Sequence, residues 1–232
     1  MSAKVIKIFE KVKSQGRSFL LEQEAKTVCK EYGIPITKMR IAKSADEAVD
    51  YSNEIGYPVV LKIISPDVLH KIDVGGVVLD INNKEEVRHA YNQIIGTVKI
   101  HKPTAKIEGV LIQEMVPSST EVIIGGIKDP QFGPTIMFGL GGTFVEVMKD
   151  VSFRIAPITK EDAQEMITEI KAYPILKGYR GQSPRDVDAI IEILLNTSRL
   201  IMDNQNIQEL DLNPVMVYTN GAKTVDARII LE

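Results

Sequence analysis

Apolar and polar residues alternate along the chain in two patterns, one with the period of a helix and one with that of a buried strand. Two helices are expected to begin at capping boxes, in which a short polar residue is followed three positions later by a glutamate. These boxes are Ser44 with Glu47 and Asn83 with Glu86. The helical pattern covers residues 19–32, the segment from Ser44 to near Gly56, the segment that Asn83 opens, 159–172 and 185–203.

Apolar runs of strand length lie between these helices. They cover residues 36–42, 58–64, 76–81, 107–116, 121–128, 134–138, 207–218 and 223–231. Adjacent strand runs are separated by short turns, and a glycine-rich bend stands at 139–142. This order favours an α+β or mixed α/β fold over a purely parallel doubly wound sheet. Residues 116–119 (VPSS) are the candidate hinge between two subdomains.

Composition narrows the class of protein. The 232 residues are 44% apolar and 25% charged, and the net charge of −3 leaves no basic footprint for nucleic acid. No apolar run approaches the roughly 20 residues of a membrane helix, and residues 1–14 lack a signal-peptide core. The single cysteine, Cys29, has helical spacing with apolar neighbours and is expected in the core. We therefore expect a cytoplasmic protein without membrane or nucleic-acid contacts.

Several common nucleotide and metal motifs are missing. No glycine is followed by lysine, so a P-loop cannot occur, and no glycine trio has GxGxxG spacing. HExxH, CxxC and GxSxG are absent as well. A nucleotide would therefore have to bind on a different scaffold.

Lys62 stands within the otherwise apolar strand 58–64 (PVVLKII). Burial of an unpaired ammonium costs free energy, so this lysine needs a partner or must point into a cleft. It is either a lysine near a strand end that turns to water, or a positive charge placed for a phosphate group.

The polar loop 65–76 (SPDVLHKIDVGG) combines a histidine, two carboxylates and a glycine pair. Neutral imidazole is abundant near pH 7, so His70 is able to attack phosphorus and later release the group. The glycine pair lets the backbone approach an anion closely. A lone loop histidine is usually only solvated, but this pattern favours a functional role. His89 and His101 lack such surroundings and are expected at the surface.

Oxygen ligands recur near the end of the chain. In an extended strand Glu209, Asp211 and Asn213 lie on one face, because side chains alternate. An antiparallel return of the chain would bring Asp226 alongside. Such a set suits magnesium shared with phosphates, although an acidic sheet edge without a metal is the alternative.

The strand 110–116 (VLIQEMV) ends in polar residues at the candidate hinge. The backbone groups of its last four residues would be able to read the edge of an adenine base, and Glu121 lies just beyond the hinge. These residues are Gln113, Glu114, Met115 and Val116. Taken alone this signal is weak, since many buried strands end in this way.

The order of these parts resembles that of ATP-grasp proteins, which carry a strand lysine, a hinge strand with glutamates and a terminal acidic-x-Asn strand before an aspartate. More closely, the sequence is similar to the small β subunits of ADP-forming acetyl-CoA synthetases, which are related to succinyl-CoA synthetase. The segments that carry the resemblance are 24–35 (EAKTVCKEYGIP), 57–77 (YPVVLKIISPDVLHKIDVGGV), 109–117 (GVLIQEMVP), 138–158 (FGLGGTFVEVMKDVSFRIAPI) and 209–215 (ELDLNPV).

The resemblance implies an ATP-grasp fold over residues 1–232, with the nucleotide in a cleft between two subdomains. The smaller subdomain, 43–116, would carry Lys62 and the His70 loop. The larger one, 117–232 with 1–42, would carry the magnesium site. The implied reaction is acyl-CoA + ADP + phosphate ⇌ carboxylic acid + CoA + ATP. The chain would catalyse it as an acid–CoA ligase subunit beside an α subunit that holds the CoA and acyl sites, in an α2β2 assembly.

The same resemblance implies a role for each site residue. A phosphoryl group would pass from a histidine of the α subunit to His70, and from His70 to ADP. Asp211 would face the phosphohistidine, while Asn213 and Asp226 would hold Mg²⁺. The expected nucleotide contacts are Lys62 with the phosphates, the backbone of Gln113 to Val116 with the base, Glu121 near the ribose, and Arg154 with a phosphate.

Two other readings remain open at this point. A stand-alone ATP-grasp carboxylate ligase would be active without a partner and would not need His70. A non-catalytic nucleotide-sensing module would be free to lose the loop histidine or the acidic-x-Asn pair, and both are present. The preferred acid, the choice of adenine over guanine nucleotide and the direction of net flux are not encoded in any motif found.

Overall fold

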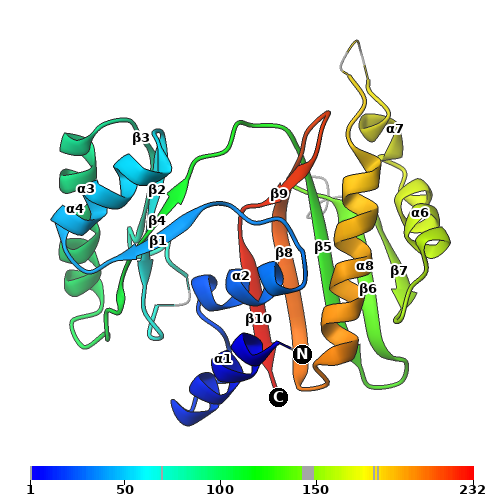
Figure 1. The fold of residues 1–232 in the computed structure, drawn as a ribbon, viewed down its shortest axis with the longest axis horizontal. Coiled ribbons are helices and arrows are strands. Elements are labelled where there is room, and N and C mark those ends of the chain that lie inside the picture. Colours follow the sequence, from blue (N-terminus) through cyan, green and yellow to red (C-terminus); the bar gives the residue numbers. More distant parts are fainter. Residues whose placement is uncertain (1, 69, 143–148, 180, 182) are drawn as a thin grey trace. The chain divides into compact units, whose positions relative to one another are not determined.

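The chain folds into two compact units, drawn as ribbons in Figure 1. The computed structural model describes residues 2–68, 70–142, 149–179, 181 and 183–232. Unit 1 combines Met1–Ile36 with Ser118–Glu232, and unit 2 is the continuous segment Thr37–Pro117. Among the residues so described, none of the helices is long and apolar enough to cross a membrane.

Unit 2 is a four-stranded antiparallel sheet with two helices, and its strand order is β1-β4-β2-β3. Both helices begin at the predicted caps: the Ser44 hydroxyl accepts from the Glu47 N–H, and the Asn83 side chain accepts from the Glu86 N–H. Apolar side chains of the helices pack on one face of the sheet. The elements are β1 Met39–Ala42, α3 Ala45–Ile55, β2 Val59–Ile64, β3 Val77–Ile81, α4 Lys84–His101 and β4 Gly109–Glu114.

Unit 1 is built on a larger antiparallel sheet in the order β10-β8-β5-β6-β7, with β9 paired to β8. Its strands are β5 Thr120–Asp129, β6 Gly133–Leu140, β7 Val151–Ile155, β8 Ile207–Val217, β9 Ala222–Thr224 and β10 Ala227–Leu231. Its helices are α1 Ala3–Ser14, α2 Glu22–Glu31, α6 Lys160–Glu169, α7 Tyr173–Leu176 and α8 Val187–Asp203. The first part of the chain completes this unit, because α1 and α2 join the same apolar core as α8.

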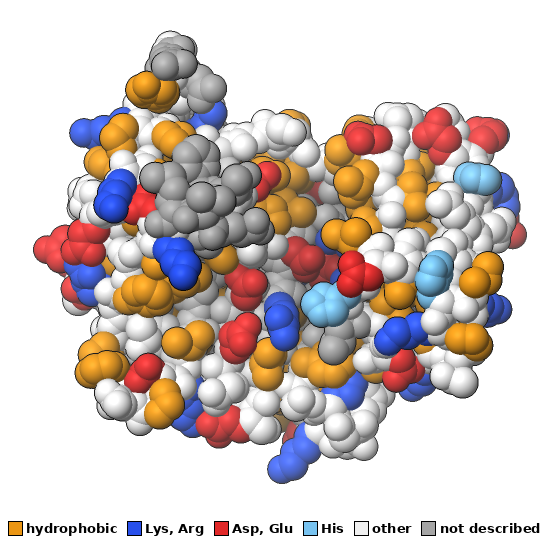
Figure 2. All heavy atoms as spheres, turned by 180° about the vertical axis from the view of Figure 1, so that it is seen from behind, with side chains coloured by type: hydrophobic (Ala, Val, Ile, Leu, Met, Phe, Trp, Pro, Cys, Tyr) orange, Lys and Arg blue, Asp and Glu red, His pale blue; other side chains and the backbone are white. Residues whose placement is uncertain are grey.

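The two faces of the unit 1 sheet differ in character, because side chains alternate along each strand. The face toward α8 is apolar, and Leu210 and Leu212 of β8 are buried there. We call the opposite side the outer face; Asp211 belongs to it because it alternates with these two leucines. Figure 2 shows this face, since α8 lies in front of the sheet in Figure 1 and Figure 2 is turned by 180°.

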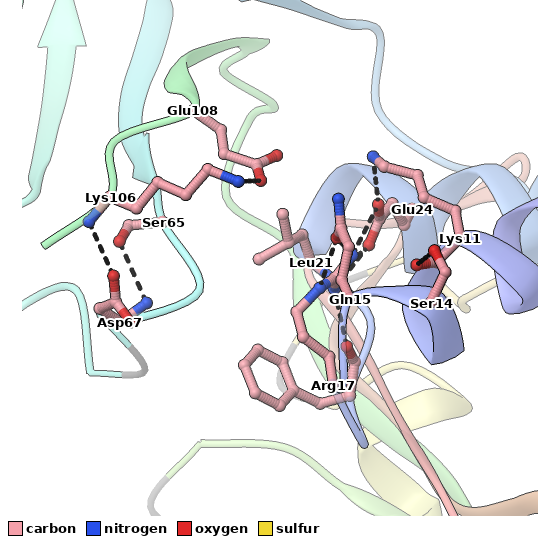
Figure 3. Close-up of polar contacts among 11 residues, drawn as sticks. Lys11, Ser14, Gln15, Arg17, Leu21, Glu24, Ser65, Asp67, Lys106 and Glu108 are labelled. Carbon is pink, nitrogen blue, oxygen red and sulfur yellow. Dashed lines mark hydrogen bonds and ion pairs between the residues drawn. The ribbon is translucent and has the colours of Figure 1, made fainter.

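A buried ion pair fixes the segment between α1 and α2. Arg17 donates to the Glu24 carboxylate at 2.9 Å, and both side chains are only 7% exposed. Lys11 Nζ lies 2.8 Å from the same carboxylate, and the Leu21 N–H donates to it at 3.0 Å (Figure 3). Burial raises the pKa of Glu24, but the bonds from Arg17 and Lys11 outweigh it, and the net shift is downward. The carboxylate is therefore kept charged where it holds the two helices together.

The structure corrects several sequence expectations. The helix α1 and the edge strand β7 were not predicted. The segment 36–42 is a strand only from Met39, and 223–231 is divided into β9 and β10. Residues 139–142 were expected as a bend, but Gly139 and Leu140 still belong to β6. Unit 2 begins at Thr37 and not at residue 43, because β1 pairs with β4 of this unit.

Candidate phosphoryl-transfer site

Lys62 lies inside β2, where it pairs with Val77 of β3 and Leu111 of β4. Its neighbours Leu61 and Ile63 belong to the core beneath the helices, so the lysine faces the other side of the sheet. Lys62 is only 8% exposed. The alternative of a lysine that simply turns to water is therefore wrong.

The histidine loop, residues 65–76, is anchored to the rest of unit 2 at its beginning. The Asp67 carboxylate accepts a hydrogen bond from the Lys106 N–H at 2.7 Å, and the Asp67 N–H donates to Ser65 Oγ at 3.1 Å (Figure 3). Lys102 Nζ donates to the Asp67 carbonyl oxygen at 3.0 Å. The bonds from Lys102 and Lys106 tie the first turn of the loop to the segment that leads into β4.

The end of the loop is closed by a backbone hydrogen bond from the Gly76 N–H to the Lys71 carbonyl oxygen at 2.7 Å. A Cβ at residue 76 would lie 2.5 Å from Ile63 Cγ2, and Gly75 has a φ of +64°. Turn geometry and packing therefore explain the glycine pair, and its role in binding an anion stays a prediction. His70 lies between the two anchors and is exposed to solvent, while its neighbour Leu69 lies outside the described residues.

The end of β4 is the predicted base-reading segment. Gln113 is 1% exposed and, because it pairs with Val60, lies on the same face of the unit 2 sheet as Lys62. The N–H groups of Glu114 and Met115 donate to the carbonyl oxygens of Lys38 and Pro58, each at 3.0 Å. Base recognition by Glu114 or Met115 would therefore use their carbonyl oxygens. The half-buried Val116 is the last residue of this segment.

Glu121 stands near the start of β5, opposite Met216 of β8. Its carbonyl oxygen accepts from the Gly141 N–H at 2.8 Å, and a Cβ at Gly141 would lie 3.0 Å from the Glu121 Cβ. The half-buried Glu121 therefore packs against the glycine bend of its own unit. Its predicted position near a ribose is not tested by these contacts.

The antiparallel return of the chain from β8 to β10 brings the predicted carboxylates together, as the sequence analysis expected. Asp211 pairs with Arg228 and Ile230 pairs with Glu209, so these side chains lie on the outer face. The Asn213 N–H donates to the Asp226 carbonyl oxygen at 3.3 Å, so Asp226, just before β10, lies beside Asn213 of β8. Below, the acidic group denotes Glu209, Asp211, Asn213 and Asp226.

The surroundings of the Asp211 carboxyl group disfavour its ionised form. Burial, which has the largest effect, and the charges of Glu209 and Asp226 together raise its pKa from 3.8 to about 6, although the charge of Arg228 lowers it. Its Oδ1 is buried without a hydrogen-bond partner among the described residues. An unsatisfied carboxylate oxygen at this position is ready to accept a proton or a hydrogen bond from a ligand.

The donor set near Asp211 fits one kind of metal site. Magnesium usually takes one or two carboxylates and fills its other positions with water and substrate phosphates. Asp226 Oδ1 accepts from the Ala227 N–H at 2.8 Å, which orients the carboxylate beside Asn213. Within the described ranges, no group of three or more His, Cys, Asp or Glu is arranged to hold a metal. These residues therefore fit a magnesium ion shared with phosphates and do not fit a metal cage made of protein alone.

Arg154 is engaged elsewhere in unit 1. It lies on β7, and its guanidinium forms ion pairs with Glu165 at 3.2 Å and with Glu169, both on α6. The hydrogen bond to Glu169 is the main reason that the pKa of Arg154 is raised. A phosphate contact by Arg154 stays a prediction, and it would require these pairs to break.

The sequence analysis missed Arg228. This residue of β10 stands directly opposite Asp211, and its charge opposes the rise in the Asp211 pKa. Its side chain is 63% exposed. The sequence could have predicted this position of Arg228. Side chains alternate along a strand, so residues 226 and 228 of the run Asp226-Ala227-Arg228 lie on one face.

The family of the chain follows from a match to the model of the ATP-grasp domain, which covers residues 11–231. The chain belongs to the ATP-grasp family. A curated relative is the acetate–CoA ligase [ADP-forming] I subunit beta of Pyrococcus furiosus, 52% identical over 99% of this chain and 98% of that protein. The acetate–CoA ligase [ADP-forming] I of Archaeoglobus fulgidus is 49% identical over 98% of this chain, but the match covers only 33% of that longer protein.

Solved structures of ATP-grasp relatives agree with this assignment. The dinucleotide-forming acetyl-coenzyme A synthetase 1 of Ca. Korarchaeum cryptofilum, in complex with coenzyme A and Ca-AMPCP, has a TM-score of 0.94 and 55% identity over 97% of this chain and 99% of that one. In another structure the same enzyme holds coenzyme A and Mg-AMPPCP, with a phosphohistidine segment pointing towards the nucleotide-binding site. That match has a TM-score of 0.88 and 50% identity over 98% of this chain and 100% of that one. The segment 138–158 includes residues 143–148, which lie outside the described residues.

Proposed function

We propose that this chain is the nucleotide-binding β subunit of an ADP-forming acetyl-CoA synthetase. The reaction would be acyl-CoA + ADP + phosphate ⇌ carboxylic acid + CoA + ATP. The observation that carries the proposal is the acidic group: Asp211 has a buried, unsatisfied oxygen beside two oxygen ligands of the magnesium type. The end-to-end similarity to a β subunit of this enzyme class supports it.

The histidine step exchanges one bond to phosphorus for another. A neutral ring nitrogen of His70 attacks the γ-phosphorus of ATP, a P–N bond forms, and the bond from phosphorus to the β,γ-bridging oxygen breaks. ADP leaves with that electron pair. In the reverse direction a β-phosphate oxygen of ADP attacks the phosphohistidine, and the electron pair of the P–N bond returns to the ring. The exposed His70 between two anchored loop ends suits such a carrier.

The residues of unit 1 would support this exchange. Asp211 accepts a hydrogen bond from the second ring nitrogen and orients the imidazole. Asn213 and Asp226 would hold magnesium, which neutralises charge on the transferred group when it is bound. In unit 2, Lys62 places a positive charge for the nucleotide phosphates. The base contact of Gln113 to Val116, the ribose contact of Glu121 and the phosphate contact of Arg154 belong to the same proposal.

A partner must supply the CoA chemistry. The Pyrococcus relative is named as one subunit, and the Archaeoglobus relative is a chain of which the matched segment is only 33%. We propose an α subunit that forms the acyl phosphate and passes the phosphoryl group to His70, in an α2β2 assembly in the cytoplasm. On the face drawn in Figure 2, side chains of Lys and Arg are interspersed with those of Asp and Glu.

The decisive experiment follows the phosphoryl group. The wild-type chain and His70→Ala are incubated with magnesium and ATP labelled at the γ position. We expect an acid-labile, base-stable label on the wild type and none on His70→Ala. His101→Ala, which removes another exposed histidine of unit 2, is the matched control and should be labelled like the wild type. Label retained by His70→Ala would place the carrier elsewhere. Acyl phosphate formation by the isolated chain, without any labelled histidine, would favour a stand-alone carboxylate ligase.

A further inference from the structure

The outer face of unit 1 is divided into a charged half and an uncharged half. The charged half consists of β8 and β10, where Asp211 and Arg228 lie opposite each other. The uncharged half consists of β5, β6 and β7. None of the residues that point to the outer face in the ranges 123–127, 133–140 and 151–155 is charged. An antiparallel sheet with one face in water usually carries polar side chains on that face, so the uncharged half departs from the rule.

Strand β7 has the reverse of the usual polarity. Ser152 Oγ donates to a carbonyl oxygen of α6 at 2.8 Å, and the Arg154 guanidinium pairs with two glutamates of α6. These polar side chains therefore lie on the side of the sheet that α6 covers. Phe153 and Ile155 alternate with them and point to the outer face. Because a shift by one residue would turn every side chain to the other face, the bonds to α6 hold β7 in the register that exposes its apolar residues.

These side chains form one continuous surface with their neighbours on β5 and β6. We call Ile127, Thr135, Met137, Phe153 and Ile155 the apolar patch. Thr135 pairs with both Ile127 and Ile155. Met137 pairs with Phe153. Residues directly opposite in antiparallel strands point to the same face and touch, so the patch is contiguous. Figure 2 shows hydrophobic side chains on this part of the outer face, at the left of the view.

The exposed area of the patch is that of a protein interface. Ile127, Phe153 and Ile155 are 45%, 47% and 55% exposed. Phe132, in the turn between β5 and β6, is 62% exposed, and its N–H donates to Asp129 Oδ1 at 2.9 Å, which orders the turn. If a large apolar side chain offers about 200 Å², these four expose about 400 Å². A stable dimer buries about 800 Å² of each copy, of which roughly 60% is apolar, so the four side chains supply most of that share.

We propose that the apolar patch is the contact surface between two copies of this chain. Around a two-fold axis one surface meets itself, so a charged residue in the patch would face a like charge. The uncharged half of the outer face meets this condition, and the half with Asp211 and Arg228 does not. The proposed α2β2 assembly contains two copies of this chain, and this contact joins them directly. The inference goes beyond the proposed function, because the contact needs neither a nucleotide nor His70.

Charges of opposite sign at one position test this symmetry. Ile155→Asp and Ile155→Lys are compared with the wild type and with Ile100→Asp and Ile100→Lys, since Ile100 is a 78% exposed isoleucine on α4 of unit 2. Sedimentation velocity of the isolated chain over a range of concentrations measures the dissociation constant of the dimer. We expect dimers of the wild type and of both Ile100 variants, and a dissociation constant raised about 100-fold in each Ile155 variant. An equimolar mixture of the two Ile155 variants should dimerise more tightly than either alone, because opposite charges then meet across the contact.

Each other outcome contradicts the inference. A wild-type chain that is monomeric at every concentration would overturn it, as would undiminished dimerisation of both Ile155 variants or a mixture that dimerises no better than its components. A wild-type chain that is monomeric alone, together with loss of α-subunit binding in Ile155→Asp, would assign the patch to that subunit instead. Histidine labelling from γ-labelled ATP at the wild-type rate will show that the Ile155 variants are folded. Absence of label on the wild type would contradict the proposed function and leave the dimer measurement unaffected.

Discussion

Replacement of Asp211 by asparagine should make the protein more stable at neutral pH while it abolishes phosphoryl transfer. Burial and the charges of Glu209 and Asp226 raise the pKa of Asp211 from 3.8 to about 6, so its ionised form is disfavoured in the folded chain. Asparagine has nearly the same shape and no charge. The variant therefore removes the cost of the charge and keeps the packing.

The direction of the pH dependence of stability follows from how tightly the folded and unfolded states bind the proton of Asp211. Between pH 3.8 and about 6 the folded state holds the proton more tightly than the unfolded state, so stability falls as pH rises through this range. The destabilisation of the folded state by ionised Asp211 is complete above about pH 6 and absent below pH 3.8. A shift of about two units corresponds to about 3 kcal/mol. Because Asp211 is only half-buried, solvent screens part of this electrostatic penalty. We therefore expect Asp211→Asn to raise the free energy of unfolding by about 1–2 kcal/mol at neutral pH.

Thermal and urea unfolding of the two proteins at pH 5 and pH 8, with a chelator and without nucleotide, will test this reasoning. At pH 8 the variant should unfold about 2–8 °C higher than the wild type, and the difference should shrink at pH 5. Glu209→Gln is the matched control, since it removes a carboxylate with a 40% exposed side chain from the same face and should have a smaller effect. An Asp211→Asn variant that is no more stable at pH 8 than at pH 5, relative to wild type, would refute the argument.

Two further outcomes are expected. Asp226→Ala should weaken magnesium-dependent nucleotide binding by about 10-fold or more, and calorimetry with and without magnesium should find no change in the metal-free affinity. Unchanged affinity with magnesium would remove Asp226 from the metal site. Asp186→Ala should cost about 1–2 kcal/mol in urea unfolding, because its carboxylate accepts from the Gly221 N–H at 2.6 Å and the Ala189 N–H at 2.9 Å. Asp186→Asn should lose less, and an equal loss in both variants would contradict the capping argument.

Periodicity and capping predicted much of unit 2 and the sheet strands of unit 1. The boxes at Ser44 and Asn83 are observed as hydrogen bonds, and Glu209, Asp211 and Asn213 share one face of β8 as alternation required. These features depend on neighbours in the sequence, which is why a single chain suffices to find them. Cys29 is likewise fully buried, and burial raises its pKa to about 12, in agreement with a core residue.

What the sequence did not predict depends on partners that are distant along the chain. The strand β7 is short and carries exposed Phe153 and Ile155, so its pattern becomes meaningful only beside β6. Arg154 pairs with α6, an arrangement that no local spacing encodes. The pairing of Gly125 with Asp211 requires the register of two strands more than 80 residues apart. Such contacts are set by the completed sheet.

The connectivity of the two units also sets an order of events during synthesis. Unit 2 is one continuous segment with its own apolar core, so it is able to fold as soon as Pro117 has left the ribosome. Unit 1 must wait for its final strand, because the Leu20 N–H donates to the Ile229 carbonyl oxygen at 2.9 Å and the Leu231 N–H donates to the Ser18 carbonyl oxygen at 2.6 Å. Helix α2 and the segment before it thus stay without β10, the strand against which they pack, until residues 227–231 have been translated.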